Sequence, residues 1–433
     1  MRRRLLTCLP ALAAAIVAWA ALGGGPERIE FVRVLGGPTR AGASASVLVG
    51  AWAIVDQRRV PVPGLSLRLV AGGAGGDVLA SGVTDASGHL EARLVLPPDP
   101  SPPKLRVERA GDGGLLAEGE LALDVEGWRA AARREGGWLP GHTRGELAIE
   151  LAVAAGVLAV PFEGRLIARV RGAPGGDARP VAGAALELEL TGAELAPLPA
   201  LPVTDARGGV EVALRPREHA VSARLLVRSG ARRGEWYGAL PVLPGALSAE
   251  LEGVGLRVRS PIERERAFVS LVSTRERLGG AVVELLPEPD GTASGRFEPG
   301  AELLARLRDE PTWAVVSSDD DKRSPAVVGW PLGAALAALP AVTFGVPDQV
   351  LLDGEARALR DLGARQSARR RGGSALLGAI AVLTGGLFWK EVRGRRRQPA
   401  SAVPTRDGWF FLIALASIAL GLGALAYFGA LRR

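Results

Sequence analysis

Short segments in which apolar and polar residues alternate fill the middle of the chain. Residues 65–69 (LSLRL) and 186–190 (LELEL) place an apolar side chain at every second position. This period of two gives a strand with one face in a core and the other face in water. Because Gly, Pro and Asp separate such segments throughout, the pattern predicts a mostly β region of short strands and tight turns.

Two stretches of this region repeat each other. VTDASG at 83–88 returns as VTDARG at 203–208, with the threonines 120 positions apart, and a glycine upstream of each motif returns 119 positions later, at Gly64 and Gly183. A strand-like segment precedes each glycine and another follows each motif. Nearly equal offsets over some 20 residues indicate an internal repeat of one supersecondary unit. Further corresponding segments are 46–50 with 165–169, 90–96 with 210–214, and 104–107 with 224–227.

A third copy follows the same order of segments but lacks the Thr-Asp motif; its segments are 250–259, 267–273, 280–286 and 295–297. A leader strand is expected before each copy, at 29–34, 147–153 and 251–258. The sequence therefore predicts three β-sandwich modules, at 26–127, 128–245 and, diverged, 246–347.

The Thr-Asp-x-x-Gly motif suits a reversal between two strands. Asp accepts hydrogen bonds from backbone N–H groups two residues on, and Gly adopts a left-handed backbone conformation. The alternative is that Asp85 and Asp205 bind calcium, but one carboxylate per turn falls short of the six to eight oxygens that calcium takes. The turn interpretation is favoured.

The order Pro-x-Pro-Gly-Leu, strand, Val-Thr-Asp-Ala-Ser-Gly, strand, Leu-Pro-Pro resembles bacterial immunoglobulin-like (Ig-like) and macroglobulin-like sandwich modules. It is also similar to the carboxypeptidase regulatory-like module. The resemblance covers residues 40–125 and 160–243 well, and the third module poorly. It implies a sandwich fold but no particular function. Macroglobulin relatives that trap proteases carry a Cys-Gly-Glu-Gln thioester, and this chain has no such motif.

The first 25 residues predict export. Three arginines at 2–4 precede an apolar run at 5–22, which is either a signal peptide cleaved after Ala18-Trp19-Ala20 or an uncleaved signal anchor. Cys8 faintly resembles a lipoprotein processing site, but most of the apolar run follows it, so lipidation is rejected. It is the chain's one cysteine, so no disulfide can form within the chain.

Two further apolar segments, 373–389 and 409–431, predict a C-terminal two-helix transmembrane hairpin. The loop between them, 390–408, is basic and therefore expected in the cytoplasm. Residues 348–372 are expected to form an amphipathic basic helix next to the membrane, either a stalk or a partner-binding helix. Its arginines lie on the predicted outer side, so the export signal and not the basic charge decides the orientation.

The formal net charge of +7 raises the possibility of a nucleic-acid partner. Much of the excess, however, lies beside apolar segments, at 2–4, 369–371 and 395–397, where basic residues set membrane topology and meet lipid headgroups. Nucleic-acid binding is therefore not expected. The partners expected are a lipid bilayer and an unidentified protein of the membrane or cell envelope.

No combination of residues predicts catalysis. The histidines at 89, 142 and 219 have no metal-ligand spacing, and neither a Gly-x-Ser-x-Gly elbow nor a phosphate loop occurs. The acidic run 319–321 is read as a solvated loop rather than a calcium site, and Trp313 and Trp330 as core residues. No catalytic, cofactor or metal site is predicted.

These observations predict a non-enzymatic binding or scaffolding protein in the cytoplasmic (inner) membrane of a bacterium, with its β modules on the extracytoplasmic side. The alternative is an accessory subunit of a membrane transport or secretion complex, which a two-span hairpin favours because one span would suffice as an anchor. An enzyme with an unrecognised site in the third module is a third reading, which the lack of paired catalytic groups disfavours.

Overall fold

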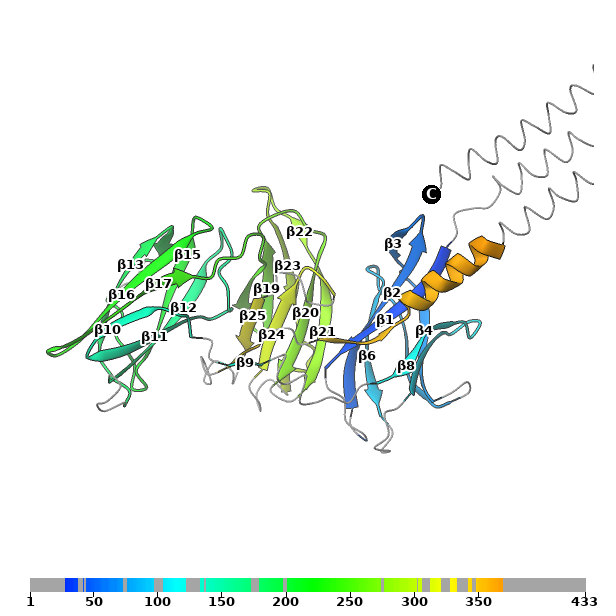
Figure 1. Ribbon diagram of the computed structural model, residues 1–433, viewed down its shortest axis with the longest axis horizontal. Coiled ribbons are helices and arrows are strands. Elements are labelled where there is room, and N and C mark those ends of the chain that lie inside the picture. Colours follow the sequence, from blue (N-terminus) through cyan, green and yellow to red (C-terminus); the bar gives the residue numbers. More distant parts are fainter. Residues whose placement is uncertain are drawn as a thin grey trace, which may run out of the picture. The chain divides into compact units, whose positions relative to one another are not determined.

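The computed structural model describes residues 28–368, except for 38–41, 43, 73–75, 97–103, 122–132, 136–137, 173–178, 198–200, 274–275, 302, 306–311, 321–327, 333–341 and 345–347. The described part is mostly β, as expected, and consists mainly of antiparallel sheets of four or five strands (Figure 1). Residues 30–53 and 60–355 form one compact unit.

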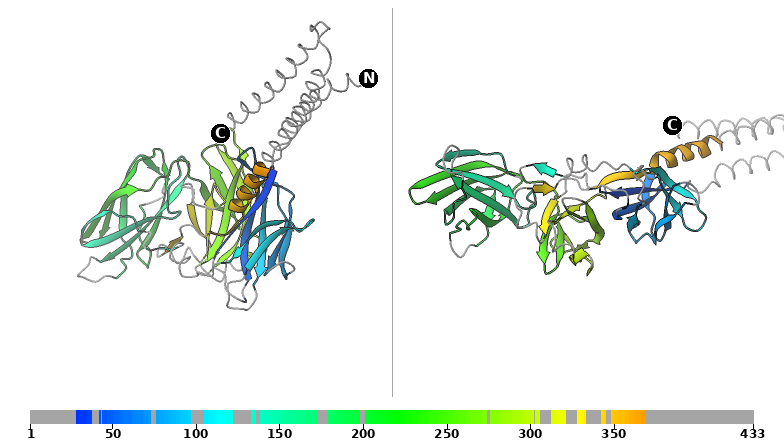
Figure 2. Two further views of the ribbon diagram at one scale, coloured as in Figure 1. Left: turned by 45° about the vertical axis from the view of Figure 1, so that its right-hand side comes forward. Right: turned by 90° about the horizontal axis from the view of Figure 1, so that it is seen from below.

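The sandwich formed by residues 142–240, green in Figures 1 and 2, follows directly from the alternating pattern. One sheet has the order β11-β12-β15-β14, and the other β10-β17-β16-β13. Every second residue of β12 is buried, and both sheets contribute to one apolar core around Trp236. The strands are β10 (His142–Gly145), β11 (Leu147–Val153), β12 (Gly164–Gly172), β13 (Ala185–Thr191), β14 (Ala193–Leu195), β15 (Gly209–Pro216), β16 (Val221–Ser229) and β17 (Arg232–Leu240).

The first sandwich has the same central strands in both sheets but different edge strands. Its sheets are β27-β1-β2-β3, with β6 also paired to β2, and β5-β4-β7-β8. Its strands are β1 (Arg28–Gly36), β2 (Ser44–Val55), β3 (Arg58–Pro61), β4 (Ser66–Ala71), β5 (Val78–Val83), β6 (His89–Val95), β7 (Lys104–Arg109), β8 (Leu115–Glu120) and β27 (Gln349–Asp353).

The third sandwich, residues 248–332, has the sheets β18-β19-β23-β22 and β21-β20-β24-β25 around its own apolar core. Its strands are β18 (Ser248–Glu252), β19 (Gly255–Ser260), β20 (Arg266–Ser273), β21 (Arg277–Glu284), β22 (Leu286–Pro287), β23 (Ala293–Phe297), β24 (Thr312–Ser317) and β25 (Val328–Leu332). A separate two-stranded sheet joins β9 (Arg133–Glu135) to β26 (Val342–Phe344).

The strand order confirms the internal repeat. The strand that follows the Asp turn pairs with the strand after the leader strand in both clear copies, β6 with β2 and β15 with β12. The third copy does the same with β23 and β19. One detail of the prediction is wrong: residues 251–258 are not a single leader strand but cross the hairpin between β18 and β19. Gly253 lies in that turn with a φ of 64°, which interrupts the apolar run.

The prediction of a helix over 348–372 is wrong at its start. Residues 349–353 form β27, which adds to the first sandwich as the antiparallel neighbour of β1. The helix begins at Glu355 and is described to residue 368. The sequence predicts one continuous helix here from the spacing of Leu351, Leu352, Leu359 and Leu362. The first two of these leucines instead belong to a strand whose partner lies some 300 residues earlier. Such a distant pairing leaves no local signal.

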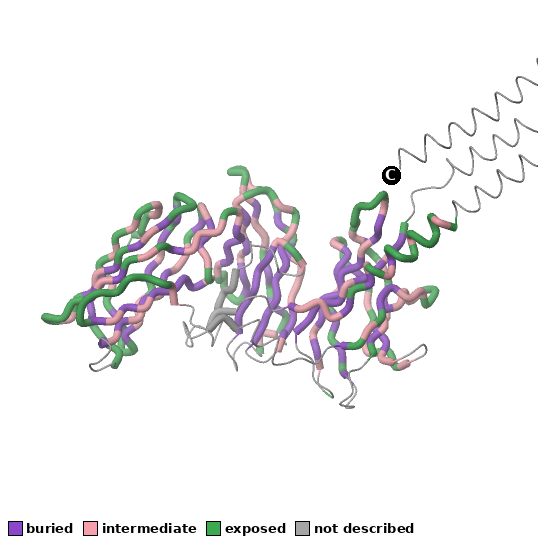
Figure 3. The backbone as a smooth tube through the Cα atoms, viewed as in Figure 1, coloured by how far each residue is buried: buried purple, intermediate pink, exposed green. Residues whose placement is uncertain are grey.

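Burial follows the sandwich plan, with buried positions concentrated on the strands and exposed ones on the turns and on the helix that begins at Glu355 (Figure 3). No helix in the described residues is long and apolar enough to cross a membrane. The apolar segments 5–22, 373–389 and 409–431, and the loop 390–408, lie outside the described residues.

Candidate functional site at the junction of the first and third sandwiches

The Thr-Asp turn is a hydrogen-bonded unit in the first sandwich. Thr84 Oγ1 donates to the carbonyl of Val62 at 2.7 Å and accepts from the backbone N–H of Leu65 at 2.9 Å. Asp85 Oδ1 accepts from the backbone N–H groups of Ser87 and His89, each at 2.9 Å. The threonine therefore joins the turn to the loop before β4, and the aspartate holds the reversal into β6.

The second copy repeats these bonds one for one. Thr204 Oγ1 donates to the carbonyl of Val181 and accepts from the N–H of Ala184, while Asp205 Oδ1 accepts from the N–H groups of Arg207 and Gly209. In both copies one carboxylate oxygen is committed to backbone donors, as the turn interpretation requires. Among the described residues, no three His, Cys, Asp or Glu side chains are placed to share a metal ion.

The third sandwich has a shortened version of the turn that the sequence pattern did not reveal. Asp290 Oδ1 accepts from the backbone N–H and the hydroxyl of Thr292, at 3.0 and 2.6 Å. Gly291 has a φ of 80°, and the reversal leads into β23. The Thr292 bonds to the carboxylate lower the pKa of Asp290. Asp-Gly thus takes the place of Thr-Asp-x-x-Gly before the equivalent strand.

The residue after the turn distinguishes the two full copies. Gly209 follows the second turn, whereas His89, only 2% exposed, follows the first. The imidazole packs edge-on against Trp52 of β2 and Phe268 of β20, with ring centroids 5.6 and 5.0 Å away. Because Phe268 belongs to the third sandwich, the first Asp turn lies at a junction between two modules.

The His89 ring has one satisfied nitrogen. Nδ1 lies 3.0 Å from both the carbonyl oxygen and the hydroxyl of Ser87. Arg266 of β20 donates to the same carbonyl at 3.1 Å. Among the described residues, Nε2 has no hydrogen-bond partner, and it lies 3.9 Å from Asp320 Oδ2.

That placement corrects the prediction for the acidic run at 319–321. Asp319 is exposed, as a solvated loop requires, but the Asp320 side chain is 15% exposed and faces His89. Asp321 lies outside the described residues. The run therefore includes a contact residue of the junction.

Arg277 at the start of β21 is the centre of the junction. Its side chain is 1% exposed. The guanidinium donates to both carboxylate oxygens of Glu91 on β6, through Nη1 to Oε1 and through Nη2 to Oε2 at 2.9 Å. Nε donates to Asp348 Oδ1 at 3.1 Å, and Nη1 to Ser46 Oγ at 2.8 Å. One side chain of the third sandwich thus bonds to β2 and β6 of the first and to the segment that leads into β27.

The groups around Arg277 favour the charged form of its guanidinium. Burial by itself lowers the pKa of the Arg277 guanidinium, but the charges and hydrogen bonds of Glu91 and Asp348 outweigh it, so the pKa is raised above its ordinary value. The Asp348 side chain is fully buried and also accepts from Ser270 Oγ at 2.8 Å. Both charges beside Arg277 are therefore paired and hydrogen-bonded, which is the condition for burying them.

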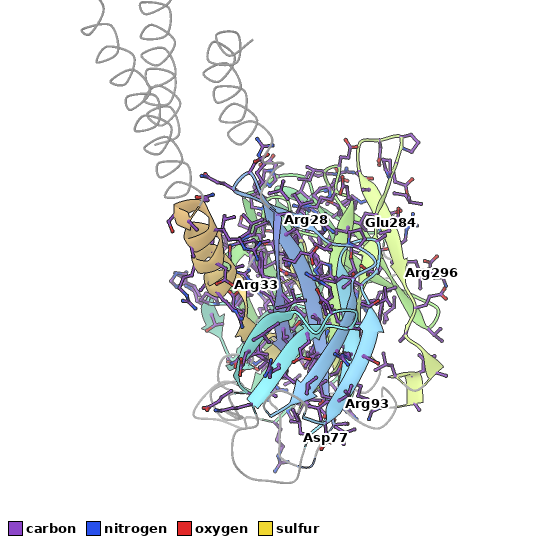
Figure 4. The ribbon with its side chains drawn as sticks, turned by 90° about the vertical axis from the view of Figure 1, so that its right-hand side faces the viewer. Arg28, Arg33, Asp77, Arg93, Glu284 and Arg296 are labelled. Atoms are coloured by element: carbon purple, nitrogen blue, oxygen red, sulfur yellow. The ribbon has the colours of Figure 1, made fainter. Side chains whose placement is uncertain are left out.

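Apolar contacts complete the junction. Leu35, Leu48 and Phe268 are buried together, with the partly buried Val282 and Val350 packed against them. These residues come from β1, β2, β20, β21 and β27, so two modules and the returning strand share one small core. At the outer end of β27, Arg33, labelled in Figure 4, donates to Asp353 at 3.1 Å and to Glu355 at 2.9 Å.

Chemically, this arrangement fastens modules together. The Ser87 hydroxyl lies 3.0 Å from His89 Nδ1 and also donates to Asp85 Oδ1 at 2.7 Å, so it is bonded into the turn. Sequence reasoning noted His89 and Asp320 but did not bring them together, and it missed Arg277 entirely. An arginine at the start of an apolar strand is ordinary in a sequence, and only the distant Glu91 and Asp348 show that it is buried.

Other residues noted in the sequence lie apart from the junction. Trp313 is 2% exposed within β24, which confirms it as a core residue. Trp330 is on β25, where the side chain is not described. His142 and His219 are exposed, and Cys8 lies outside the described residues.

Comparison with known proteins returned no matching family model and no matching curated protein. Among solved structures, the chain is similar to the D0-D1 domain of intimin at 12% identity and a TM-score of 0.18, covering 47% of this chain and 93% of that one. Invasin, a bacterial integrin-binding protein, matches at 12% identity and 0.18, covering 70% and 60%. The adhesin FdeC of Escherichia coli matches at 12% and 0.16, covering 70% and 96%. These structures are bacterial Ig-like adhesin domains. For this chain, the sandwich assignment is carried by the strand order and hydrogen bonds above.

Proposed function

We propose that the protein is a membrane-anchored, extracytoplasmic β-sandwich protein that acts as a non-enzymatic binding or scaffolding module. The observation that carries this proposal is the pairing of β1 with β27. The two strands are antiparallel, with Arg33 opposite Asp353 and Gly36 opposite Gln349. The chain therefore enters the first sandwich at Arg28 at the same end of the sheet at which it leaves after Asp353.

This topology suits an anchor made from both ends of the chain. The export segment at 5–22 precedes β1, and the apolar segments 373–389 and 409–431 follow β27. With both connections at one end of one sheet, all three segments can reach a single bilayer without crossing the sandwiches. The modules between β1 and β27 then extend from the anchored end and can bind a ligand or partner.

Membrane attachment is tested by fractionation of cells that express the full chain. We expect the protein in the membrane pellet, resistant to alkaline carbonate, and a variant ending at residue 372 in the carbonate supernatant if the N-terminal segment is cleaved. Release of the full chain by carbonate would contradict an integral anchor.

The second candidate function is that of an accessory subunit of a membrane transport or secretion complex. The predicted two-span hairpin favours it, because a single span is enough to tether a binding module. Gentle solubilisation followed by affinity purification through a C-terminal tag separates the two. A recurrent membrane partner supports the accessory role, and recovery of the protein alone supports a free-standing module.

A further inference from the structure

The helix that follows β27, described from 355 to 368, has one sheltered side and one basic side. Ala358 is 4% exposed and Leu362 is partly buried. With 3.6 residues per turn, Arg357, Arg360 and Ala364 share the side opposite to those two residues. Arg360 and Ala364 are exposed, and 43% of the Arg357 side chain is exposed.

Apolar surface lies next to the basic side. Leu359, one residue from Arg360, is 50% exposed, and Ala356 and Gly363 are exposed on the same flank. An exposed leucine beside arginines is the pattern of a helix that lies in the interfacial layer of a membrane, where long basic side chains reach headgroups and short apolar ones enter the acyl boundary.

The charges on this helix are available to a partner. Arg357 approaches Asp361 at 3.8 Å, with both side chains largely exposed, and such a surface pair contributes little. Arg360 and Arg365 are exposed. From 355 to 371 the sequence carries six arginines against two acidic residues, a net charge of +4.

Chain length limits how far this helix can lie from a bilayer. Residue 373, where the next apolar segment starts, is five residues beyond residue 368. Even fully extended, five residues reach only about 18 Å. If 373–389 spans the membrane, the end of the helix is therefore within about two Debye lengths of the lipid surface at 0.1 M salt.

From these observations we propose that the side of this helix formed by Arg357, Arg360 and Leu359 docks on anionic phospholipid headgroups. The helix then lies on the lipid surface instead of serving as a loose stalk. This inference rests on the proposed membrane attachment.

The test uses the full chain in lipid nanodiscs. In a Cys8→Ala background, Ala364→Cys supplies a single thiol on the basic side for an environment-sensitive fluorophore. Discs of phosphatidylcholine alone are compared with discs containing one-third phosphatidylglycerol, and acrylamide quenching reports the exposure of the probe. We expect blue-shifted, less quenched emission in the anionic discs, and loss of that difference in 1 M salt, where the Debye length falls to about 3 Å.

The Arg357→Gln/Arg360→Gln variant removes the two charges of the basic side while keeping good helix formers. Each arginine near an anionic surface contributes about a five-fold factor, so the ratio of docked to undocked helix should fall about 30-fold. The matched control, Arg207→Gln/Arg232→Gln, removes two exposed arginines from the second sandwich and should leave the ratio unchanged.

The outcomes separate this inference from the proposal on which it rests. Failure of the chain to enter nanodiscs would contradict the proposed membrane attachment itself. Entry with identical probe emission in neutral and anionic discs, or an equal effect of both double variants, would overturn lipid docking alone. A shift seen in native membrane vesicles but absent from anionic discs would also overturn it, in favour of a protein partner.

Discussion

Arg277→Met provides the sharpest test of the junction between the first and third sandwiches. The substitution keeps much of the side-chain volume but removes the charge and all five hydrogen bonds made to Glu91, Asp348, Ser46 and Ser270. Asp348, fully buried, keeps its bond from Ser270 but loses its arginine partner. Removal of one partner from a buried ion pair typically costs about 3–5 kcal/mol, because the other charge stays buried.

That cost should appear locally. Hydrogen exchange of peptides covering β6 and β21, followed by mass spectrometry, reports the free energy of opening at the junction. We expect a decrease of about 3 kcal/mol or more there, and little change in the second sandwich.

Two controls decide the interpretation. Arg296→Met removes an arginine whose side chain is 52% exposed and pairs with the exposed Glu298, so it should cost less than about 0.5 kcal/mol. Arg277→Met/Asp348→Leu removes both buried charges and should recover about 1–3 kcal/mol of the single-variant loss. If Arg277→Met costs less than 1 kcal/mol, or if the double variant gains nothing, the junction is not held by this ion pair.

The turns give three further predictions. Thr84→Val and Thr204→Val each remove a hydroxyl that donates to a carbonyl and accepts from an N–H. Each variant should lower the free energy of unfolding by about 1–3 kcal/mol. Equal losses would show that the two copies of the turn are equivalent. Gly208→Ala places a Cβ 2.5 Å from the carbonyl oxygen of Val170 at a φ of 71°. It should therefore destabilise the protein by more than Gly183→Ala, a position with a similar φ but open space around the added Cβ. Thermal unfolding of the two variants compares them, and equal decreases in Tm would contradict the steric argument. Thr292→Val removes a hydroxyl bond that lowers the pKa of Asp290, so an NMR titration should show that pKa rising toward its ordinary value, and an unchanged titration would contradict the assigned cause.

The strands and turns of the sandwiches could be predicted because the sequence patterns that specify them span only a few neighbouring residues. Alternation in residues 186–190 marks one face of β13, and the Thr-Asp motif specifies its own turn through bonds within a few residues. The repeat extended that reading to a second copy and, through segment order alone, to a third. Gly253 and the Asp290 turn show the limit: a different turn chemistry hides an equivalent place in the fold.

The junction could not be predicted because its partners are far apart in sequence. Arg277 bonds to Glu91, 186 positions earlier, and to Asp348, 71 positions later. Likewise, β27 was read as part of a helix because its pairing with β1 leaves no periodic signal in five residues. Burial of a charge is a property of the folded chain, so a single sequence shows the arginine but not its environment.

Labelling of single cysteines on the two sides of the membrane tests the central claim most directly. In the Cys8→Ala background, one variant carries Glu218→Cys on the second sandwich, where the residue is exposed, and another carries Ser401→Cys in the loop 390–408. We expect a membrane-impermeant maleimide to label residue 218 in intact spheroplasts and residue 401 only after the membrane is permeabilised. Labelling of 401 but not 218 in intact spheroplasts would place the sandwiches in the cytoplasm and contradict the account.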